Sequence, residues 1–256
     1  MIFDAHAHYD DSAFDEDRDE LLNSMADKGV GFILNSGSDI PSSEASVALA
    51  DRYPFIYAAV GVHPHEAKSW NGEAEERLKE LLNAPKVVAL GEIGLDYHYD
   101  LSPRDVQKAV FRRQLEIATE RDIPVVIHER EALADTLEII NDFPNVKGMF
   151  HCFSGSPETA AELVKKGWYI SLGGAVTFKN AKKPPAVLAS VPEDRLLVET
   201  DCPYMSPVPH RGKRNDSSLI SYVLQKAEEV RGISAKEIET RTCENALRLF
   251  GIRSKA

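Results

Sequence analysis

Short apolar runs alternate with helical patterns along the whole of this 256-residue chain. The runs recur with a spacing of roughly thirty residues and are mostly continuous rather than alternating, which is typical of parallel strands covered on both faces. The eight expected strands are residues 2–6, 30–35, 55–62, 87–92, 125–128, 146–151, 168–172 and 196–201.

Helical periodicity fills the intervals between these runs. Three helix starts carry a capping signal: Ser102-Pro103 with Asp105, Ser156-Pro157 and Ser234 with Glu237. The expected helices are residues 15–28, 43–52, 74–82, 104–121, 132–141, a helix from 156, a short segment at 186–190, 218–231 and 234–250.

Eight strand-helix units in a chain of this length predict an α/β fold of the (β/α)8 TIM-barrel type with an extra helix at the C-terminal end. No low-complexity linker divides the sequence, so we expect a single domain over residues 1–256. An open doubly wound sheet is the alternative. Its Gly-x-Gly-x-x-Gly fingerprint is missing from the first turn, which counts against it.

The sequence is typical of a soluble cytoplasmic protein. It has no basic region followed by an apolar run, and no stretch approaches the roughly 18 apolar residues of a membrane span. Cys152, Cys202 and Cys243 lie far apart and show no Cys-x-x-Cys spacing, so we expect neither a disulfide framework nor a thiolate zinc site.

Histidines and carboxylates close one apolar run after another. In a barrel, the carboxyl ends of all strands meet at one mouth. Five of the eight histidines lie at or just beyond such ends, more than random placement would give. The five are His6, His8, His63, His128 and His151, and the carboxylates at such ends are Glu92 and Asp201.

These residue types at these places favour a divalent-metal site. His6 and His8 are two apart on a strand and project to the same side, and imidazole is a common metal ligand. Glu92 lies within a nearly apolar segment, where a carboxylate without a cation is costly. Each residue alone could instead be hydrogen-bonded, and Glu199 competes with Asp201. Asp96 is expected to bind a loop or orient a ligand.

Four imidazoles and two carboxylates exceed what one tetrahedral ion needs, which favours two ions bridged by a carboxylate. No lysine ends the fourth or fifth strand to carry a bridging carbamate, so Glu92 is expected to bridge. One ion would take His6, His8 and Asp201, and the other His128 and His151. Zinc, magnesium and manganese all stay open.

The net charge of −11 argues against a protein that coats duplex DNA. Two groups of cations nevertheless follow the last two strands and could form a phosphate track at the mouth, or else be solvated loops. His63 and His65 are further candidates for substrate contact, or form a rigid turn around Pro64. Tyr97, Phe153 and Tyr204 lie beside expected ligands and could stack on bases. The cations are Lys179, Lys182, Lys183, Arg211, Lys213 and Arg214.

Several linked motifs together resemble the TatD family of metal-dependent deoxyribonucleases, within the amidohydrolase-like barrels. The resemblance covers almost the whole chain. It implies a distorted (β/α)8 barrel, divalent-metal phosphodiesterase activity on DNA, and metal ligands at His6, His8, Glu92, His128, His151 and Asp201. The motifs are Asp4-Ala-His-Ala-His8, Gly61-Val-His-Pro-His-Glu-Ala67, Gly91-Glu-Ile-Gly-Leu-Asp-Tyr97, Pro124-Val-Val-Ile-His128, His151-Cys-Phe-Ser-Gly155, Glu199-Thr-Asp-Cys-Pro-Tyr204 and His210-Arg-Gly-Lys-Arg-Asn215.

Two positions depart from the family pattern. Glu129 follows His128 where the family usually has a small residue or Cys, which adds a negative charge near the site. Ala7 replaces a small polar residue or Cys between His6 and His8.

The expected reaction is attack of a hydroxide held between two ions on the phosphorus of DNA, with Asp201 accepting and returning a proton. We expect a single-stranded substrate cut from an end and no membrane partner, and the pattern does not indicate an oligomeric state. A binuclear hydrolase of a small amide, lactone or phosphoester is the main alternative. A catalytically silent metal- or partner-binding barrel is the second. The basic rim favours the nuclease over the small-molecule hydrolase, and the complete set of expected ligands argues against the silent barrel.

Overall fold

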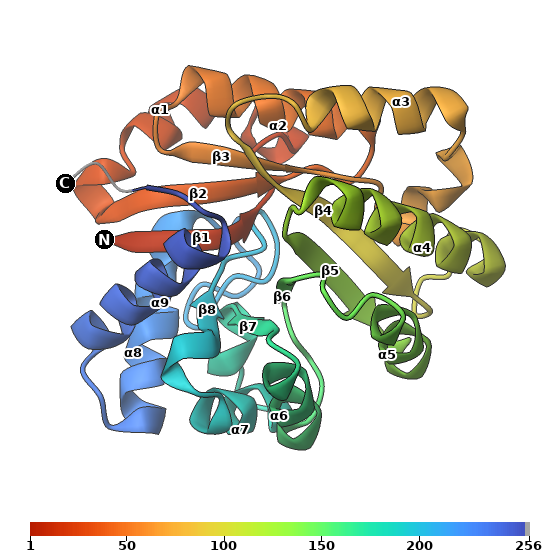
Figure 1. Ribbon diagram of the computed structural model, residues 1–256. Helices are drawn as coiled ribbons and strands as arrows, with labels where there is room; N and C mark the ends of the chain where they lie inside the picture. The colour runs from red at the N-terminus through yellow and green to blue at the C-terminus, as the bar shows by residue number, and fades with distance from the viewer. Residues whose placement is uncertain (254–256) are drawn as a thin grey trace. The chain divides into compact units, whose positions relative to one another are not determined.

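Over residues 1–253, eight strands alternate with helices (Figure 1). The computed structural model describes residues 1–253. The strand order in the sheet is the order in the chain, and the strands pair in parallel. The open doubly wound alternative is therefore wrong, since such a sheet reverses its strand order. The strands are β1 Ile2–Ala7, β2 Val30–Ser36, β3 Ile56–Val60, β4 Val87–Asp96, β5 Val125–Arg130, β6 Gly148–Phe150, β7 Tyr169–Leu172 and β8 Leu196–Val198.

Helices occupy the intervals that the sequence predicts. In the described part of the chain, two helices rather than one follow β8, which confirms the expected extra helix near the C-terminal end. The helices are α1 Arg18–Asn23, α2 Ile40–Arg52, α3 Gly72–Leu81, α4 Arg104–Arg121, α5 Leu133–Asn141, α6 Pro157–Lys165, α7 Lys183–Ser190, α8 Ile220–Arg231 and α9 Ala235–Leu249.

The chain forms two units, each with its own buried side chains. The first unit holds residues 1–34 and the chain from residue 151 onward, and the second unit holds residues 35–150. That the whole chain acts as a single domain stays a prediction.

In the first unit, α9 packs against β1 and β8. Phe3 of β1 stacks on Phe250, with ring centroids 5.9 Å apart, and on Phe32 at 5.5 Å. Asn245 of α9 donates to the carbonyl of Leu196 at the start of β8. These contacts fix the two strands whose carboxyl ends carry His6, His8 and the loop to Asp201.

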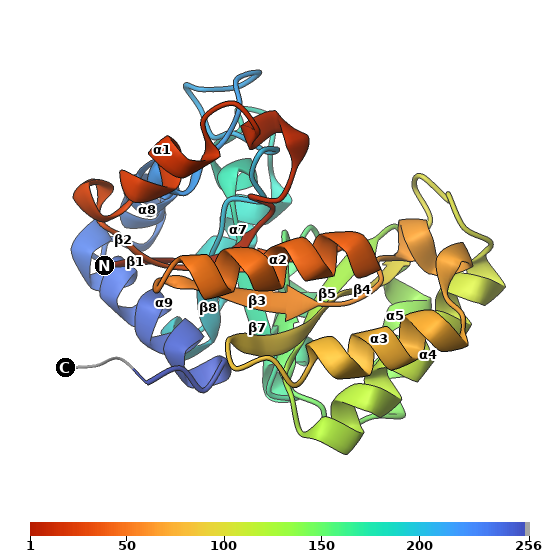
Figure 2. The same cartoon turned by 90° about the horizontal axis from the view of Figure 1, so that it is seen from above.

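In the second unit, α2 packs on β3 and α4 packs on β4 (Figure 2). Gln114 of α4 accepts from the Val62 amide at 2.8 Å and donates to the Val62 carbonyl at 2.9 Å, which fixes the segment leading to His63. Gly94 pairs with His128 across β4 and β5, and has φ 145°. A Cβ at Gly94 would lie 1.9 Å from the His128 carbonyl oxygen, so only glycine fits there.

Three local predictions need correction. The helix expected over residues 15–28 is limited to α1, with single 3₁₀ turns at Ser12–Phe14 and Ala26–Lys28 on either side. The strand expected to end at Glu92 continues to Asp96, as β4. Ser102 does not cap α4, because its hydroxyl donates to the His65 carbonyl instead.

The other two capping predictions agree with the structure. Ser156 accepts from the Thr159 amide at the start of α6, and Ser234 accepts from the Glu237 amide at the start of α9. Each hydroxyl satisfies one of the amides that a helix start leaves without an intrahelical acceptor.

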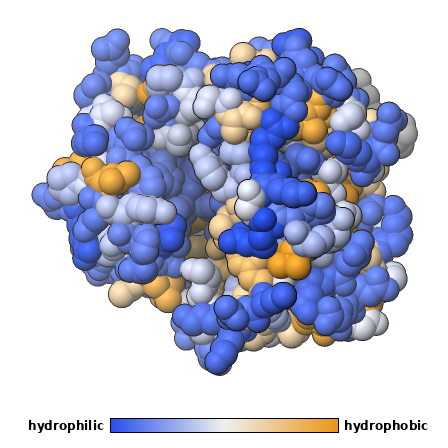
Figure 3. Space-filling view, turned by 180° about the vertical axis from the view of Figure 1, so that it is seen from behind, coloured by the Kyte–Doolittle hydropathy of each residue, from blue (hydrophilic) through white to orange (hydrophobic). Residues whose placement is uncertain are grey.

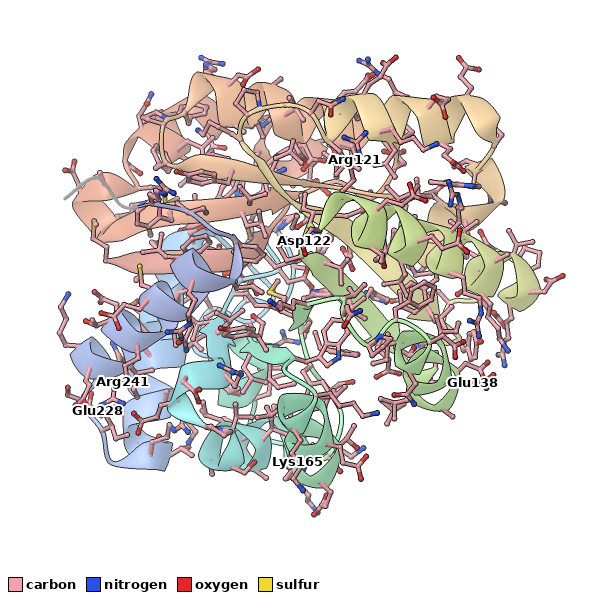
Figure 4. The ribbon with its side chains drawn as sticks, viewed as in Figure 1. Arg121, Asp122, Glu138, Lys165, Glu228 and Arg241 are labelled. Carbon is pink, nitrogen blue, oxygen red and sulfur yellow. The ribbon has the colours of Figure 1, made fainter. Side chains whose placement is uncertain are left out.

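The molecular surface in Figure 3 is mostly hydrophilic, with small separated hydrophobic patches. Charged side chains project from the helices, and those labelled in Figure 4 are all exposed, for example Glu138 of α5 and Lys165 of α6. Among residues 1–253, no helix combines the length and apolar character that a bilayer crossing requires. Cys152, Cys202 and Cys243 form no disulfide.

Candidate active site

His6, His8 and Asp201 come together in the first unit and form what we call the β1 group. The Nε2 atoms of His6 and His8 lie 3.0 Å apart. The Asp201 Oδ1 atom lies 3.5 Å from His8 Nε2 and 3.8 Å from His6 Nε2. The structure thus brings together the three residues that the sequence assigns to one ion.

The donor atoms of the β1 group fit a divalent cation. Nitrogen and oxygen ligands lie about 2.0–2.2 Å from zinc, so two ligand atoms on one ion are roughly 3 Å or slightly more apart. The separations of 3.0 to 3.8 Å in the β1 group match that requirement. Two imidazoles and one carboxylate suit zinc and its transition-metal neighbours, and the group has the composition of a ligand set rather than of an ordinary ion pair.

Asp4 fixes the position of the β1 group through hydrogen bonds. Its buried carboxylate accepts four hydrogen bonds, from the His6 amide at 3.3 Å, the Thr200 amide at 3.0 Å, the Thr200 hydroxyl at 2.6 Å and the Ser217 hydroxyl at 2.7 Å. Thr200 directly precedes Asp201, whose amide donates to the His6 carbonyl at 3.0 Å. Strand β1 and the loop after β8 are therefore tied together at the position of the candidate ligands.

The backbone conformation and the surroundings of Asp201 favour its ionised carboxylate. Its backbone has φ 57°, an uncommon left-handed conformation that clusters at functional sites. Burial alone would raise the pKa of Asp201, but the neighbouring His8, His151 and His6 outweigh burial and lower the pKa. A carboxylate with a lowered pKa suits a metal ligand better than a general base at neutral pH.

His151 and Glu199 extend the β1 group. The His151 ring stacks on the His6 ring, with centroids 3.9 Å apart. Glu199 is completely buried, accepts from the Cys152 amide at 2.5 Å, and lies 3.6 Å from His151 Nδ1. Its other oxygen, Oε2, is buried without a hydrogen-bond donor among residues 1–253. Because an uncompensated buried charge is costly, this oxygen is further evidence for a cation or a water nearby.

The sequence leaves Glu199 and Asp201 as competitors, and the geometry gives them different tasks. Asp201 faces His6 and His8, whereas Glu199 fixes the loop after β6 and faces His151. Both residues lie beyond β8, which ends at Val198. Sequence position alone could not separate them, because both follow the same strand.

His63, Glu92 and His128 form a second set of donors, the β4 group, in the second unit. Glu92 Oε1 lies 2.8 Å from His128 Nδ1 and 3.3 Å from His63 Nε2. The sequence assigns His63 to substrate contact, and the structure instead places it beside Glu92 as a candidate ligand. The sequence does contain a signal for this role of His63, because His63 lies just after β3 and every other predicted ligand also lies near a strand end.

Asp96 supports the β4 group and orients histidines, one of the two roles that the sequence suggests for it. Its buried Oδ2 lies 3.1 Å from His128 Nε2 and 2.9 Å from His65 Nε2. Its Oδ1 accepts from the amides of His98 and Tyr99. A carboxylate on the far nitrogen of a metal-binding histidine fixes the orientation of the ring, and Asp96 has that relation to His128.

Charge in the β4 group is set by burial. Burial lowers the pKa of His63 to about 4, against a smaller opposite effect of Glu92, so the imidazole is neutral at neutral pH. A neutral imidazole is the form that binds a metal. Burial would raise the pKa of Asp96, but the bonds from His128, the Tyr99 amide and His65 hold it well below its usual range.

The predicted phosphate-binding cations divide into two kinds. Arg214 makes a two-pronged ion pair with Asp17 and lies over the Phe14 ring. Arg211 is exposed, its guanidinium 3.8 Å from the centroid of Phe178. Neither Arg211 nor Lys213 has a carboxylate ion-pair partner within the described chain. Arg211 is therefore better suited to a phosphate than Arg214.

The three aromatic residues that are predicted to stack on bases differ in their exposure and contacts. Phe153 is buried and cannot stack on a base. Tyr97 donates to Asp135 and lies under the guanidinium of Arg104. Tyr204 is 56% exposed, with its hydroxyl bonded to Asp11. The sequence argument missed Tyr99, which is 53% exposed.

The model of the family described as TatD related DNase matches residues 3–251. The chain belongs to the TatD family. It is 45% identical to the metal-dependent hydrolase YabD of Bacillus subtilis (strain 168), over 98% of this chain and 100% of that protein. It is 35% identical to the 3'-5' ssDNA/RNA exonuclease TatD of Cronobacter sakazakii (strain ATCC BAA-894), over 97% of each chain.

A solved structure agrees with these relatives. The crystal structure of the TatD homologue YJJV from Escherichia coli K12 superposes with a TM-score of 0.93, at 31% identity, over 98% of each chain. This likeness confirms the expected (β/α)8 TIM-barrel fold. The TatD-family chain is an enzyme, a metal-dependent hydrolase.

Proposed function

We propose that this TatD-family hydrolase cleaves phosphodiester bonds of single-stranded DNA from an end, using two divalent cations. The observation that carries the proposal is the pair of donor groups, each with two imidazoles and one carboxylate at metal-ligand spacing. The name of the Cronobacter relative, a 3'-5' ssDNA/RNA exonuclease, supports this substrate class.

Each donor group has a defined task in the proposal. The β1 group, His6, His8 and Asp201, holds one cation, and Glu92 with His128 contributes to the other. Bound divalent cations would polarise a phosphoryl oxygen and lower the pKa of water. Asp4 keeps the β1 ligands in place, and Asp96 keeps His128 in place. The bridging role of Glu92 and the assignment of His151 to the second cation stay predictions.

The proposed substrate is consistent with the charge of the chain. An acidic protein with a net charge of −11 lacks the long basic face that grips a duplex. A few exposed cations such as Arg211 and Lys213 suffice for a short stretch of phosphates. His65 lies beside His63 and stays partly exposed, so it is a candidate contact for a phosphate or the leaving oxygen. Cysteines that form no disulfide suit a reducing compartment, and a cytoplasmic location is part of the proposal.

The test combines metal analysis of the purified protein with cleavage assays under magnesium, manganese and zinc. The substrates are a linear single-stranded oligonucleotide, the matched duplex and a circular single strand. We expect about two ions per chain and cleavage of the linear single strand well above the other two. Equal cleavage of the circle would refute the need for an end, and faster cleavage of a blunt duplex would refute the strand preference. Turnover of lactones, amides or small phosphoesters without any nuclease activity would favour the small-molecule alternative.

A further inference from the structure

The loop after β4 carries an unusual exposed surface. Four large hydrophobic side chains are more than half exposed among residues 1–253, and two of them, Tyr99 and Leu101, lie in this loop at 53% each. Exposed apolar side chains that gather in one place mark binding surfaces more often than scattered ones do. The loop directly follows Asp96, which supports the β4 group.

A hydrogen bond and ring contacts fix the position of Tyr99. Its amide donates to Asp96 Oδ1 at 2.8 Å, and the other oxygen of the same carboxylate contacts His128 and His65. The Tyr99 ring meets the His65 ring at 5.4 Å and the His98 ring at 4.8 Å, both nearly at right angles. A single carboxylate therefore positions Tyr99, His65 and His128 of the β4 group.

Arg130 supplies a cation at the same place. It is the last residue of β5, two residues after His128, so the two side chains leave the strand on the same side. Its guanidinium lies over the Tyr99 ring, 4.8 Å from the centroid. Arg130 is exposed and has no carboxylate ion-pair partner in the described part of the chain, unlike Arg104, which pairs with Asp100.

We propose that Tyr99 and Arg130 form a nucleotide subsite beside the β4 group, in which Tyr99 stacks on a base and Arg130 binds the adjoining phosphate. An exposed aromatic ring paired with an exposed cation is the combination that single-stranded nucleic-acid sites use, because stacking holds the base and the cation follows the backbone. This inference rests on the proposed nuclease function and identifies the residues that select a base-bearing chain over a simple phosphodiester.

The test compares two oligonucleotides of equal length, a normal single strand and one whose nucleotides carry no bases. Stacking is worth about 1–3 kcal/mol per base, roughly a 5- to 150-fold effect on binding. The wild-type metal-loaded enzyme should show a KM for the normal strand lower by such a factor. Tyr99→Ala should remove most of this advantage and leave the baseless strand unaffected, whereas Tyr99→Phe should keep it.

Tyr57→Ala is the matched control. Tyr57 lies under the ammonium of Lys86 in the same unit, near the start of β3 and thus at the opposite strand end from His63. Its replacement should leave both KM values unchanged. Arg130→Ala should raise KM for both strands and reduce the slope of log KM against log salt by about one.

A spectroscopic variant gives a readout besides activity. In Tyr99→Trp, stacking of a base should quench the added indole fluorescence when the normal strand binds, and the baseless strand should not. Equal KM values of the wild type for the two strands, unaltered by Tyr99→Ala, would overturn the subsite while leaving the nuclease function standing. Failure of the wild type to cleave either strand with any metal would overturn the proposed function itself, and the subsite with it.

Discussion

The Thr200 hydroxyl donates to the Asp4 carboxylate at 2.6 Å, and this bond ties strand β1 to the loop that carries Asp201. Both partners are buried, with Asp4 completely inaccessible to solvent. Because Asp4 also accepts from the His6 amide, one carboxylate controls the distance between ligands that lie almost 200 residues apart in the chain, as the span from His6 to Asp201 shows.

Asp4→Asn should therefore weaken the β1 group without touching its ligands. Asparagine places an amide donor where Asp4 Oδ2 accepts from Thr200 and Ser217, and a buried donor without an acceptor costs about 1–3 kcal/mol. Loss of such supporting bonds typically reduces metal affinity about 10- to 100-fold. Competition with a metal-sensitive dye and thermal unfolding of the metal-free protein measure the two effects. Asp142→Asn, at an exposed carboxylate, is the control and should change neither.

Glu92→Gln should lower metal content and activity together. The substitution keeps the size of the side chain but removes the charge that faces His128 at 2.8 Å and His63 at 3.3 Å. Metal analysis after dialysis and a nuclease assay on the same sample give the result. Glu138→Gln, on the exposed face of α5, is the control. If Glu92→Gln retains metal and activity near wild-type levels, Glu92 is not a ligand.

Most of the candidate site could be predicted from the sequence because parallel strands impose a simple rule. Strand ends meet at one edge of the sheet, so His6, His8 and Asp201 could be grouped from their positions alone. The structure brings these three residues together as predicted.

The tasks of His63 and Glu92 could not be predicted in the same way. The register between β4 and β5 is irregular from Leu90 to Ile93, so the alternation of side chains along β4 cannot be counted through Glu92. Which histidine faces Glu92 therefore depends on a local irregularity without a sequence signal.

Ser102 shows a similar limit. Its sequence context is typical of a helix cap, yet its hydroxyl bonds to the His65 carbonyl, 37 residues away. The hydroxyl bonds to a residue that is distant in the chain instead of capping the helix. No local sequence pattern identifies such a distant partner.

Replacing Arg211 and Arg214 with alanine should raise KM for DNA and flatten its salt dependence, with little loss of metal. Most of the change should come from Arg211, because Asp17 neutralises Arg214 within the protein. The measurement is KM for a single-stranded oligonucleotide at several salt concentrations, for each single variant and for the pair. If the salt dependence of KM is unchanged in the double variant, both residues belong to solvated loops and do not bind phosphate.

The last prediction concerns an ion pair between two helices of the second unit. Arg113 of α4 binds Glu75 of α3 through two nitrogens, at 2.6 and 3.1 Å, and Lys79 adds a contact at 2.8 Å. Arg113 and Lys79 lower the pKa of Glu75 to about 2, from an ordinary value of 4.5. The folded state therefore favours the ionised carboxylate. The stabilisation is complete above pH 4.5 and is lost as the pH falls toward about 2.

Glu75→Gln should accordingly reduce the free energy of unfolding at pH 7 by about 1 kcal/mol, since a partly exposed pair is worth little more than that. The difference from wild type should shrink as the pH falls below 4.5. Urea unfolding of the metal-free protein at pH 7, 4.5 and 3.5 measures it, because metal ligation then adds no pH dependence of its own. Glu76→Gln is the matched control, since Glu76 contacts the same Lys79 at 2.9 Å but is 72% exposed. A Glu75 effect that is equally large at all three pH values would show that packing, and not charge, explains the loss.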